Sequence, residues 1–247
     1  MTTDRLTFIR DNYQQVLSRV ERAAVSAARN IDEVRVVVVT KGHPLEVVGA
    51  AIEAGAEVLG ENYVEEAASK IAALGNDTTV EWHMIGHIQS RKASAVCQYF
   101  DCVHSVDRLK IAERLNRYWA DETRKLPVLL ECNISGEESK FGWAAWDEER
   151  HWPAVFGKVA EVLAYPNLAV KGLMTMAPFL PSPELARPYF RRLRRLRDQL
   201  SNRFPMAEWE ELSMGMSADY EVAVQEGATL VRLGTAILGK RPDGAEY

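Results

Sequence analysis

Apolar residues along this chain follow two alternating patterns. Short, dense runs of β-branched and other apolar residues are typical of buried strands, and longer segments with apolar residues at every third or fourth position are typical of amphipathic helices. The patterns predict strands at 34–40, 57–60, 81–86, 102–106, 127–133, 169–175, 208–213 and 229–234. They predict helices at 4–29, 45–54, 64–74, 90–100, 107–124, 146–164, 183–202 and 218–226.

The regular alternation of strands and helices predicts βαβ units and a parallel sheet. Eight units fit a single closed (β/α)8 TIM barrel that spans residues 1–247, with the helix at 4–29 as an extra N-terminal element. The apolar positions of that helix are Phe8, Val16, Val20, Ala23, Ala24 and Ala27. The alternative is a doubly wound open sheet, which usually carries a G-x-G-x-x-G turn when it binds a nucleotide, and the sequence contains no such turn.

The overall composition is that of a globular protein without a general affinity for nucleic acid or membranes. The chain has 247 residues, of which 47% are hydrophobic and 26% are charged, and its formal net charge is −5. That charge gives no attraction to nucleic acid, and no apolar stretch reaches the roughly 20 residues that a membrane span needs. Residues 1–30 also lack the apolar core of a secretory signal.

The three cysteines, Cys97, Cys102 and Cys132, show no C-x-x-C spacing. Their odd number and their spacing suggest neither a disulfide framework nor a zinc site. A reducing, cytoplasmic location is therefore expected.

One predicted helix is rich in arginine. Four apolar residues between positions 190 and 200 recur at spacings of three and four. The five arginines that lie between them are Arg191, Arg192, Arg194, Arg195 and Arg197. This spacing predicts a helix with its apolar stripe on the barrel and its arginines in water. A site for nucleic acid or an acidic partner is the alternative interpretation.

Lys41 ends the first predicted strand, which is a dense run of β-branched residues. An ammonium group at the end of a buried strand is costly unless it is paired or loses its proton. A lysine desolvated in this way has a lowered pKa and can act as an amine nucleophile, for example to form a Schiff base. A lysine whose charged end simply reaches out into water is the alternative, and this segment taken alone favours it.

In a barrel of this kind the functional residues lie at the C-terminal ends of the strands. The seventh predicted strand ends in Ser213-Met214-Gly215-Met216-Ser217, and the eighth ends in Gly234-Thr235. Loops after these two strands are the usual phosphate site of the fold, where backbone N–H groups and a helix N-terminus bind the anion. Ser217 stands where the N-cap of the next helix is expected. Ordinary loop and capping chemistry is the alternative explanation of both loops.

Arg232 lies between aliphatic residues of the eighth predicted strand, so its buried charge needs a partner. A structural ion pair with Glu210 or Glu131 is one interpretation, and contact with a bound ligand is the other. A strand-end lysine, two phosphate-type loops and an inward arginine together suggest pyridoxal 5′-phosphate (PLP). That cofactor needs a Schiff-base lysine, a phosphate site and a partner for its pyridine nitrogen.

Longer motifs carry a resemblance to a known family. They are Val38-Val39-Thr40-Lys41, Gly60-Glu61-Asn62-Tyr63, Trp82-His83-Met84-Ile85-Gly86-His87-Ile88-Gln89-Ser90, Ser105-Val106-Asp107, Asn133-Ile134-Ser135-Gly136-Glu137-Glu138-Ser139-Lys140 with Gly142, Gly172-Leu173-Met174, Leu212-Ser213-Met214-Gly215-Met216-Ser217 and Val231-Arg232-Leu233-Gly234-Thr235. As a set they resemble the pyridoxal phosphate homeostasis protein family over about residues 5 to 240. The resemblance implies a single barrel similar to the N-terminal domain of bacterial alanine racemase. Only Phe141 and Trp143, in a variable loop, depart from it.

The resemblance also implies a cofactor site. Lys41 would hold PLP as an aldimine, Asn62 would lie near the ring, and Arg232 would face the pyridine nitrogen. The residues implied around the phosphate, largely through backbone N–H groups, are Ser213, Met216, Ser217, Gly234 and Thr235.

Arg232 bears on the choice between a carrier and a catalyst. An arginine cannot accept the ring proton, so the ring nitrogen stays neutral and carbanion stabilisation is weaker. The similar alanine racemase barrel also has an arginine there, but it adds a tyrosine base from a second domain, which is not expected in a chain that ends at Tyr247. Tyr63, His87 or His104 as a second base is the alternative, although packing or ring stacking explains each of them better.

The sequence therefore predicts a PLP-binding protein of vitamin B6 homeostasis that stores, buffers or delivers the cofactor without robust catalysis. Apo forms of PLP-dependent enzymes are the expected recipients, and a barrel without a second domain favours a monomer. A low-activity PLP-dependent amino-acid racemase is the alternative function. Noncovalent binding of another phosphorylated metabolite is a third.

Overall fold

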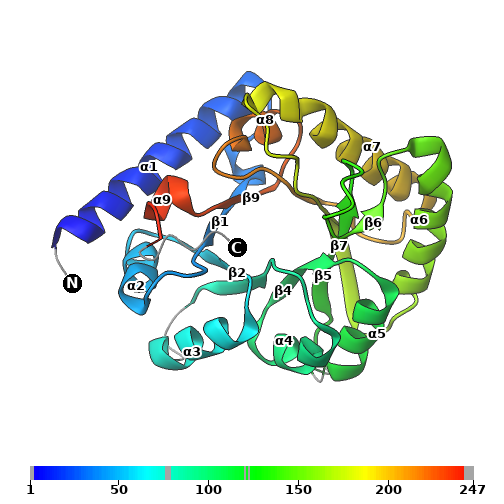
Figure 1. Ribbon diagram of the computed structural model, residues 1–247, viewed down its shortest axis with the longest axis horizontal. Helices are drawn as coiled ribbons and strands as arrows, with labels where there is room; N and C mark the ends of the chain where they lie inside the picture. The colour runs from blue at the N-terminus through cyan, green and yellow to red at the C-terminus, as the bar shows by residue number, and fades with distance from the viewer. Residues whose placement is uncertain (1–2, 76–78, 120, 122, 242–247) are drawn as a thin grey trace.

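Eight parallel strands close into a barrel in the computed structural model, which describes residues 3–75, 79–119, 121 and 123–241 (Figure 1). Around the barrel their order is β4, β3, β2, β1, β9, β8, β7 and β5, and β4 pairs with β5 to close it. Their bounds are β1 Arg35–Val39, β2 Val58–Glu61, β3 Glu81–Met84, β4 Cys102–Val106, β5 Leu126–Asn133, β7 Leu168–Met174, β8 Glu211–Ser213 and β9 Leu230–Leu233. The predicted (β/α)8 TIM barrel is therefore confirmed.

Helices surround the strands, as Figure 1 shows. Their bounds are α1 Thr3–Ser26, α2 Leu45–Glu53, α3 Val64–Leu74, α4 Ala93–Tyr99, α5 Leu109–Tyr118, α6 Glu148–Leu163, α7 Arg187–Arg203, α8 Tyr220–Gln225 and α9 Thr235–Leu238. The short α9 and the two-residue strand β6 (Trp143–Ala144), which pairs with β5, were not predicted. None of the helices in the described part of the chain is long and apolar enough to cross a membrane.

Alternation along the strands separates the barrel interior from the helix layer. In β1, Val36 and Val38 belong to the large core between barrel and helices, whereas Val37 belongs to a small inner cluster. The other buried members of that inner cluster are Val58, Leu129, Met174 and Leu230. Because successive side chains of a strand point to opposite faces, Val37 marks the interior face of β1, and Lys41 lies in phase with it beyond the strand end.

The extra helix α1 covers the barrel wall where the last and first units meet. It packs against α2, α8 and α9 (Figure 1). Most of its predicted apolar face is buried, at Val16, Val20, Ala23 and Ala24. Phe8 was assigned to the same face but is 51% exposed, and Ile9 is buried in its place. Successive side chains of an α-helix point about 100° apart, so with Ile9 in the buried face Phe8 lies at the edge of that face.

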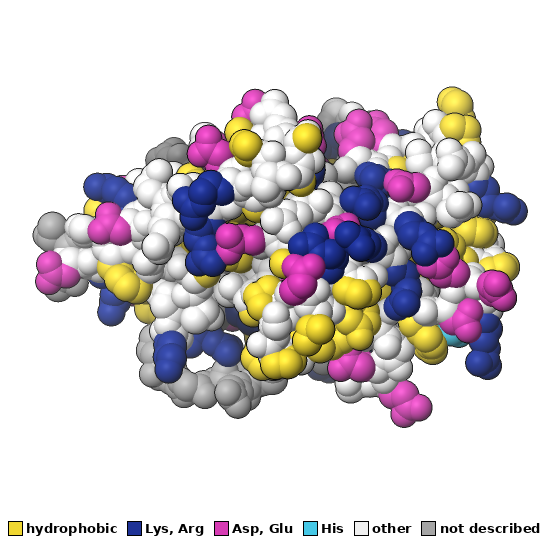
Figure 2. All heavy atoms as spheres, turned by 90° about the horizontal axis from the view of Figure 1, so that it is seen from above, with side chains coloured by type: hydrophobic (Ala, Val, Ile, Leu, Met, Phe, Trp, Pro, Cys, Tyr) yellow, Lys and Arg dark blue, Asp and Glu magenta, His cyan; other side chains and the backbone are white. Residues whose placement is uncertain are grey.

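The arginine-rich helix α7 buries its predicted apolar stripe, but its arginines are not left to water alone. The buried residues of the stripe are Phe190, Leu193, Leu196 and Leu200. Arg191 and Arg194 pair with Glu226, at 3.1 and 3.5 Å, and Arg192 donates to the Ile134 carbonyl oxygen at 2.8 Å. Figure 2, which views the side uppermost in Figure 1, shows Lys and Arg side chains interspersed with Asp and Glu. These arginines therefore tie α7 to neighbouring elements.

Candidate functional site

The residues predicted to bind a cofactor come from four neighbouring strands, β2, β1, β9 and β8. In that order the strands carry, just beyond their C-terminal ends, Asn62, Lys41, the pair Gly234 and Thr235, and the pair Met216 and Ser217. Because the strands are parallel, these ends meet at one mouth of the barrel. The structure thus brings together residues that lie far apart in the sequence.

Lys41 lies two residues beyond the end of β1 and is partly buried. Burial lowers the pKa of its amine below the usual value, and the positive charges of Arg241 and Arg232 act in the same direction, against the opposing effect of Glu61 and Glu66. Within the described residues, its Nζ has no hydrogen-bond or ion-pair partner. A lowered pKa increases the fraction of lysine that carries an unprotonated amine, which is the nucleophilic form.

A second lysine, Lys70 of α3, is buried beside this position. Its Nζ donates to Glu61 Oε1 at 2.6 Å and to the Thr40 carbonyl oxygen at 2.8 Å. The Thr40 hydroxyl donates to the same Glu61 oxygen at 2.7 Å, while Glu61 Oε2 has no partner in the described structure. Burial raises the pKa of Glu61, and Lys70 opposes that shift.

Glu66 extends this cluster to the other side of Lys41. Its Oε1 accepts from Lys70 Nζ at 2.7 Å and from the backbone N–H of Gly42 at 2.6 Å. Since Thr40 and Gly42 flank Lys41, the cluster holds the backbone on both sides of the candidate nucleophile. No motif pointed to Lys70, because a lysine in a helical segment normally lies in water.

Arg232 lies inside the barrel on β9 and is 5% exposed. Its Nη1 donates to Ser213 Oγ at 2.6 Å and its Nη2 to the Thr175 carbonyl oxygen at 2.9 Å. Within the described part of the chain, neither Glu131 nor Glu210 forms an ion pair with Arg232, which was one of the two interpretations of its sequence position. Burial lowers the pKa of Arg232 to about 10, against the effect of the Glu131 charge. Its other N–H groups have no partner within the described residues, so they remain available to a ligand.

Ser217 does not cap α8, so that part of the prediction was wrong. The helix begins at Tyr220, with Asp219 at the N-cap position. The carboxylate of Asp219 accepts a hydrogen bond from the Met216 N–H at 2.7 Å and closes a turn. The helix begins only after this turn. Ser217 Oγ instead accepts from the Ala236 N–H at 3.3 Å, and this bond joins the loops after β8 and β9.

The joined loops carry unpaired backbone donors. Across the described ranges, no residue accepts a hydrogen bond from the backbone N–H of Ser217, Gly234 or Thr235. Gly215 allows the first loop to approach α8, because its φ is +93° and a Cβ there would lie 2.6 Å from the Ala223 Cβ. Neighbouring backbone N–H groups of this kind suit an anion such as a phosphate.

Two other residues predicted around the phosphate are already engaged. The Ser213 hydroxyl is fully buried and bonded to Arg232, and the Met216 N–H is bonded to Asp219. Their direct contact with a phosphate stays a prediction.

A cavity of about 460 Å3 lies beside Asn62, between the loops after β2 and β3. His87 lines it, with its Nδ1 2.9 Å from the buried carboxylate of Asp107 and its ring stacked on Phe141 at 3.7 Å between centroids. At Gly86 the chain passes so close that a Cβ would lie 2.5 Å from the Asn62 carbonyl oxygen. Asn62 is therefore held against the next loop by a glycine contact.

Comparison with known proteins assigns the chain to a family. Residues 8–242 match the family described as alanine racemase, N-terminal domain. The pyridoxal phosphate homeostasis protein of Pseudomonas aeruginosa is 41% identical over 242 residues, which cover 97% of this chain and 99% of the relative. The chain belongs to the pyridoxal phosphate homeostasis protein family.

Solved structures agree with this assignment. PipY of Synechococcus elongatus, solved with PLP bound, is 32% identical and superimposes with a TM-score of 0.77, covering 90% of this chain and 100% of PipY. Alanine racemase of Clostridium difficile is 15% identical with a TM-score of 0.66, covering 98% of this chain and 58% of the racemase. This second likeness concerns the fold alone. The predicted relation between the pyridoxal phosphate homeostasis protein family and the racemase barrel is confirmed at that level.

Glu131 of β5 is a buried carboxyl group whose titration should be visible in the stability of the protein. Burial, and secondarily the charge of Asp107, raises its pKa to about 7 from 4.5. The folded state therefore favours the protonated acid, and the free energy of unfolding should fall as pH rises between these two values. At pH 8 Glu131→Gln should be more stable than the parent by up to about 3 kcal/mol, and at pH 5 by less than about 1 kcal/mol.

Urea unfolding of the protein without PLP at both pH values measures this difference. Glu138→Gln, an exposed acid in the following loop, is the matched control and should show no such pH dependence. A stability difference for Glu131→Gln that is equal at pH 5 and pH 8 would contradict the raised pKa.

Proposed function

We propose that this protein binds PLP covalently through Lys41 and holds the cofactor for storage, buffering or delivery to apo PLP-dependent enzymes. The observation that carries the proposal is the partly buried amine of Lys41 beside the loops after β8 and β9, where neither the amine nor several backbone N–H groups have a partner among the residues that the structure describes. Membership in the pyridoxal phosphate homeostasis protein family and the PLP bound to PipY support it.

The chemistry required of Lys41 is simple. Its unprotonated Nζ adds to the aldehyde carbon of the cofactor, a C=N bond forms, and one water molecule leaves. The lowered pKa of Lys41 increases the fraction of amine able to react. When bound, the cofactor supplies the aldehyde and an electron-withdrawing ring.

The remaining residues would orient the cofactor. Backbone N–H groups of Ser217, Gly234 and Thr235 would bind the phosphate, because they are among the donors of the two joined loops that have no acceptor within the described residues. Arg232 would donate to the pyridine nitrogen, and Asn62 would lie beside the ring. A guanidinium is a donor only, so it matches a neutral, accepting ring nitrogen.

Two features favour a carrier of the cofactor over an enzyme that uses it in catalysis. Arg232 stays protonated at neutral pH even with a pKa near 10, and it therefore cannot keep the ring nitrogen charged as a carboxylate would. His104, one candidate for a second base, is fully buried and bonded to His83 and Ser213, so it is not exposed at the mouth.

One observation favours the alternative of a low-activity racemase. The Asp107 carboxylate beside His87 Nδ1 can fix that ring in the tautomer that leaves Nε2 as a base, an arrangement common in acid/base catalysis. His87 is partly exposed at the cavity beside Asn62. The stacking on Phe141 is the structural explanation of the same ring position.

Two assays on the PLP-loaded protein separate these functions. A carrier should pass PLP to an apo-enzyme even when a trap removes free PLP, and it should exchange the α-hydrogen of amino acids for deuterium no faster than free PLP does. His87→Ala should then leave both results unchanged. Exchange well above the free-PLP rate that drops at least tenfold in His87→Ala would instead establish the racemase-type activity.

A further inference from the structure

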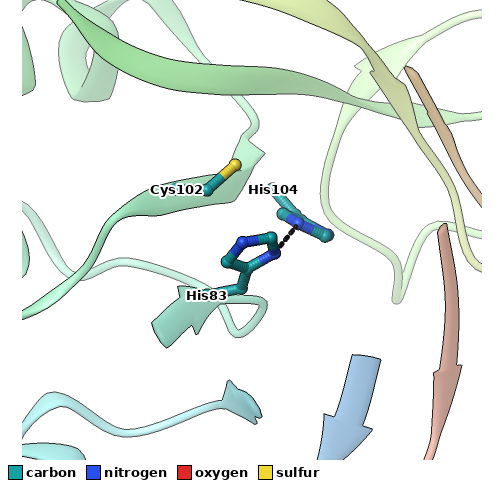
Figure 3. Close-up of side chains that lie close together, drawn as sticks. All are labelled: His83, Cys102 and His104. Atoms are coloured by element: carbon teal, nitrogen blue, oxygen red, sulfur yellow. Dashed lines mark hydrogen bonds between the residues drawn. The ribbon is translucent and has the colours of Figure 1, made fainter. Parts of the chain in front are cut away.

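A chain of hydrogen bonds runs through the barrel interior away from Arg232. Ser213 Oγ, which accepts from Arg232, lies 2.9 Å from His104 Nδ1. His104 Nε2 lies 2.9 Å from His83 Nδ1, and His83 Nε2 lies 3.0 Å from Glu81 Oε2. Figure 3 shows the two imidazole rings facing each other, with a dashed line for their hydrogen bond. The five residues come from β9, β8, β4 and β3, so the chain crosses the interior of the barrel.

This chain connects a buried cation to a carboxylate at the opposite end of the barrel. Ser213 and His104 have no exposed surface, and His83 is 1% exposed. Glu81 begins β3 and lines a cavity of about 340 Å3 at the N-terminal ends of the strands. There Arg35 pairs with Glu81 at 3.2 Å, and the hydrogen bond from His83 is the main cause that lowers the pKa of Glu81.

With both imidazole rings neutral, the Glu81 carboxylate, which can only accept, sets the direction of the hydrogen bonds from His83 back to Ser213. The Arg232 guanidinium can only donate, so Ser213 Oγ accepts from it, and the hydroxyl proton of Ser213 is then free for His104 Nδ1. His104 then carries its proton on Nε2 and donates to His83 Nδ1. His83 in turn donates from Nε2 to the Glu81 carboxylate, which can only accept. Burial lowers the pKa of His104 well below its usual value, and the positive charge of Arg232 acts in the same direction, which agrees with a neutral ring.

We propose that Glu81, His83, His104 and Ser213 are positioning residues, which hold the Arg232 guanidinium in one orientation through this one-way chain. Two of its N–H groups are fixed by Ser213 and by the Thr175 carbonyl oxygen, and this would present the others to a ligand in a defined geometry. The effect on PLP rests on the proposed function, whereas the direction of the hydrogen bonds does not.

A metal site is the competing interpretation of the same side chains. His83, Cys102 and His104 each offer a ligand atom within 4.8 Å of the others. The two imidazole nitrogens, however, lie 2.9 Å apart, closer than the roughly 3.3 Å that separates two nitrogen ligands of tetrahedral zinc. Each ring nitrogen of His83 and His104 already has a hydrogen-bond partner. The geometry is therefore that of a hydrogen-bond chain.

Nitrogen-15 NMR of the protein without PLP tests the direction of the chain. Long-range proton–nitrogen correlation should show both His83 and His104 as neutral Nε2–H tautomers at pH 7.5. Cys102→Ala should leave these signals unchanged, and elemental analysis should find no zinc. A proton on Nδ1 of His104 overturns the proposed direction, and stoichiometric zinc that is lost in Cys102→Ala overturns the proposal in favour of a metal site.

Titration with PLP tests the positioning role. Ser213→Ala should weaken PLP binding about tenfold and shift the visible absorbance of the bound cofactor, and Glu81→Gln should weaken it about threefold. Glu211→Gln is the matched control, because Glu211 also pairs with Arg35 but lies outside the chain. Folded Ser213→Ala and Glu81→Gln proteins with the affinity and spectrum of the parent would overturn the positioning role. A parent protein that fails to bind PLP would refute the proposed function and leave the tautomer result standing.

Discussion

Replacement of Lys41 by alanine is expected to abolish the visible absorbance of bound PLP and to weaken PLP retention roughly 100-fold. The substitution removes the amine that forms the C=N bond and leaves only noncovalent contacts with the phosphate loops and Arg232. The free energy of unfolding should change by less than about 0.5 kcal/mol, because Lys41 is only partly buried and has no partner within the described residues. Absorbance spectroscopy and equilibrium dialysis measure the first two effects, and urea unfolding measures the third.

Two further variants isolate the role of the amine. Lys41→Arg keeps a positive charge at this position but cannot form the C=N bond, so it should also lack the absorbance. Lys158→Ala removes an exposed lysine of α6 and should behave as the parent. Borohydride reduction of the loaded parent followed by peptide mapping should place the modification on Lys41. A modification found on Lys70, or absorbance that survives in Lys41→Ala, would refute the proposed anchor.

Replacement of Lys70 by methionine should give the largest loss of stability, a decrease of about 3 kcal/mol in the free energy of unfolding. Lys70 is the cation beside the Glu61 carboxylate, which has no exposed surface and has one oxygen without a partner in the described structure. Without that cation the carboxylate must stay charged in a dry site or take up a proton. Because burial already raises the pKa of Glu61, the loss should be greater at pH 8 than at pH 5.

Thermal and urea unfolding at the two pH values measure this loss. Lys158→Met, on the surface of α6, is the matched control and should cost little at either pH. The double substitution Lys70→Met with Glu61→Met should recover most of the stability, because it removes the buried charge together with its partner. A double variant as unstable as Lys70→Met alone would show that packing, and not the unpaired carboxylate, causes the loss.

The strands were predictable because their signal is local. The β-branched run before Lys41 became β1, and each other predicted strand appears within a few residues of its expected bounds. A buried parallel strand needs apolar side chains on both faces, so its apolar run can be recognised in the sequence without knowing which strands pair with it. Closure followed from the number of units, since eight strand–helix pairs of this length fit a barrel.

The position of the site was also predictable, because a parallel barrel brings all C-terminal strand ends to one mouth. That rule alone places Lys41, Asn62 and the two loops near Ser217 and Gly234 together. The prediction for the Ser217 cap was wrong, because the side chain of Asp219, two residues later, accepts a hydrogen bond from the Met216 N–H. Competition between neighbouring caps depends on the path of the loop, which a motif does not specify.

Local chemistry by itself thus determined the elements of the barrel and the residues at its mouth. Only the tertiary structure decided which buried groups meet. Lys70 pairs with Glu61 across the gap between α3 and β2, and His83 and His104 reach each other from adjacent strands. These contacts depend on strand order and on which face each side chain takes, and neither leaves a recognisable spacing in the sequence. The physical reason is that a buried polar residue is tolerated only when another group satisfies its hydrogen bonds or its charge. Here those groups lie on other elements, so the partners meet only once the barrel has closed.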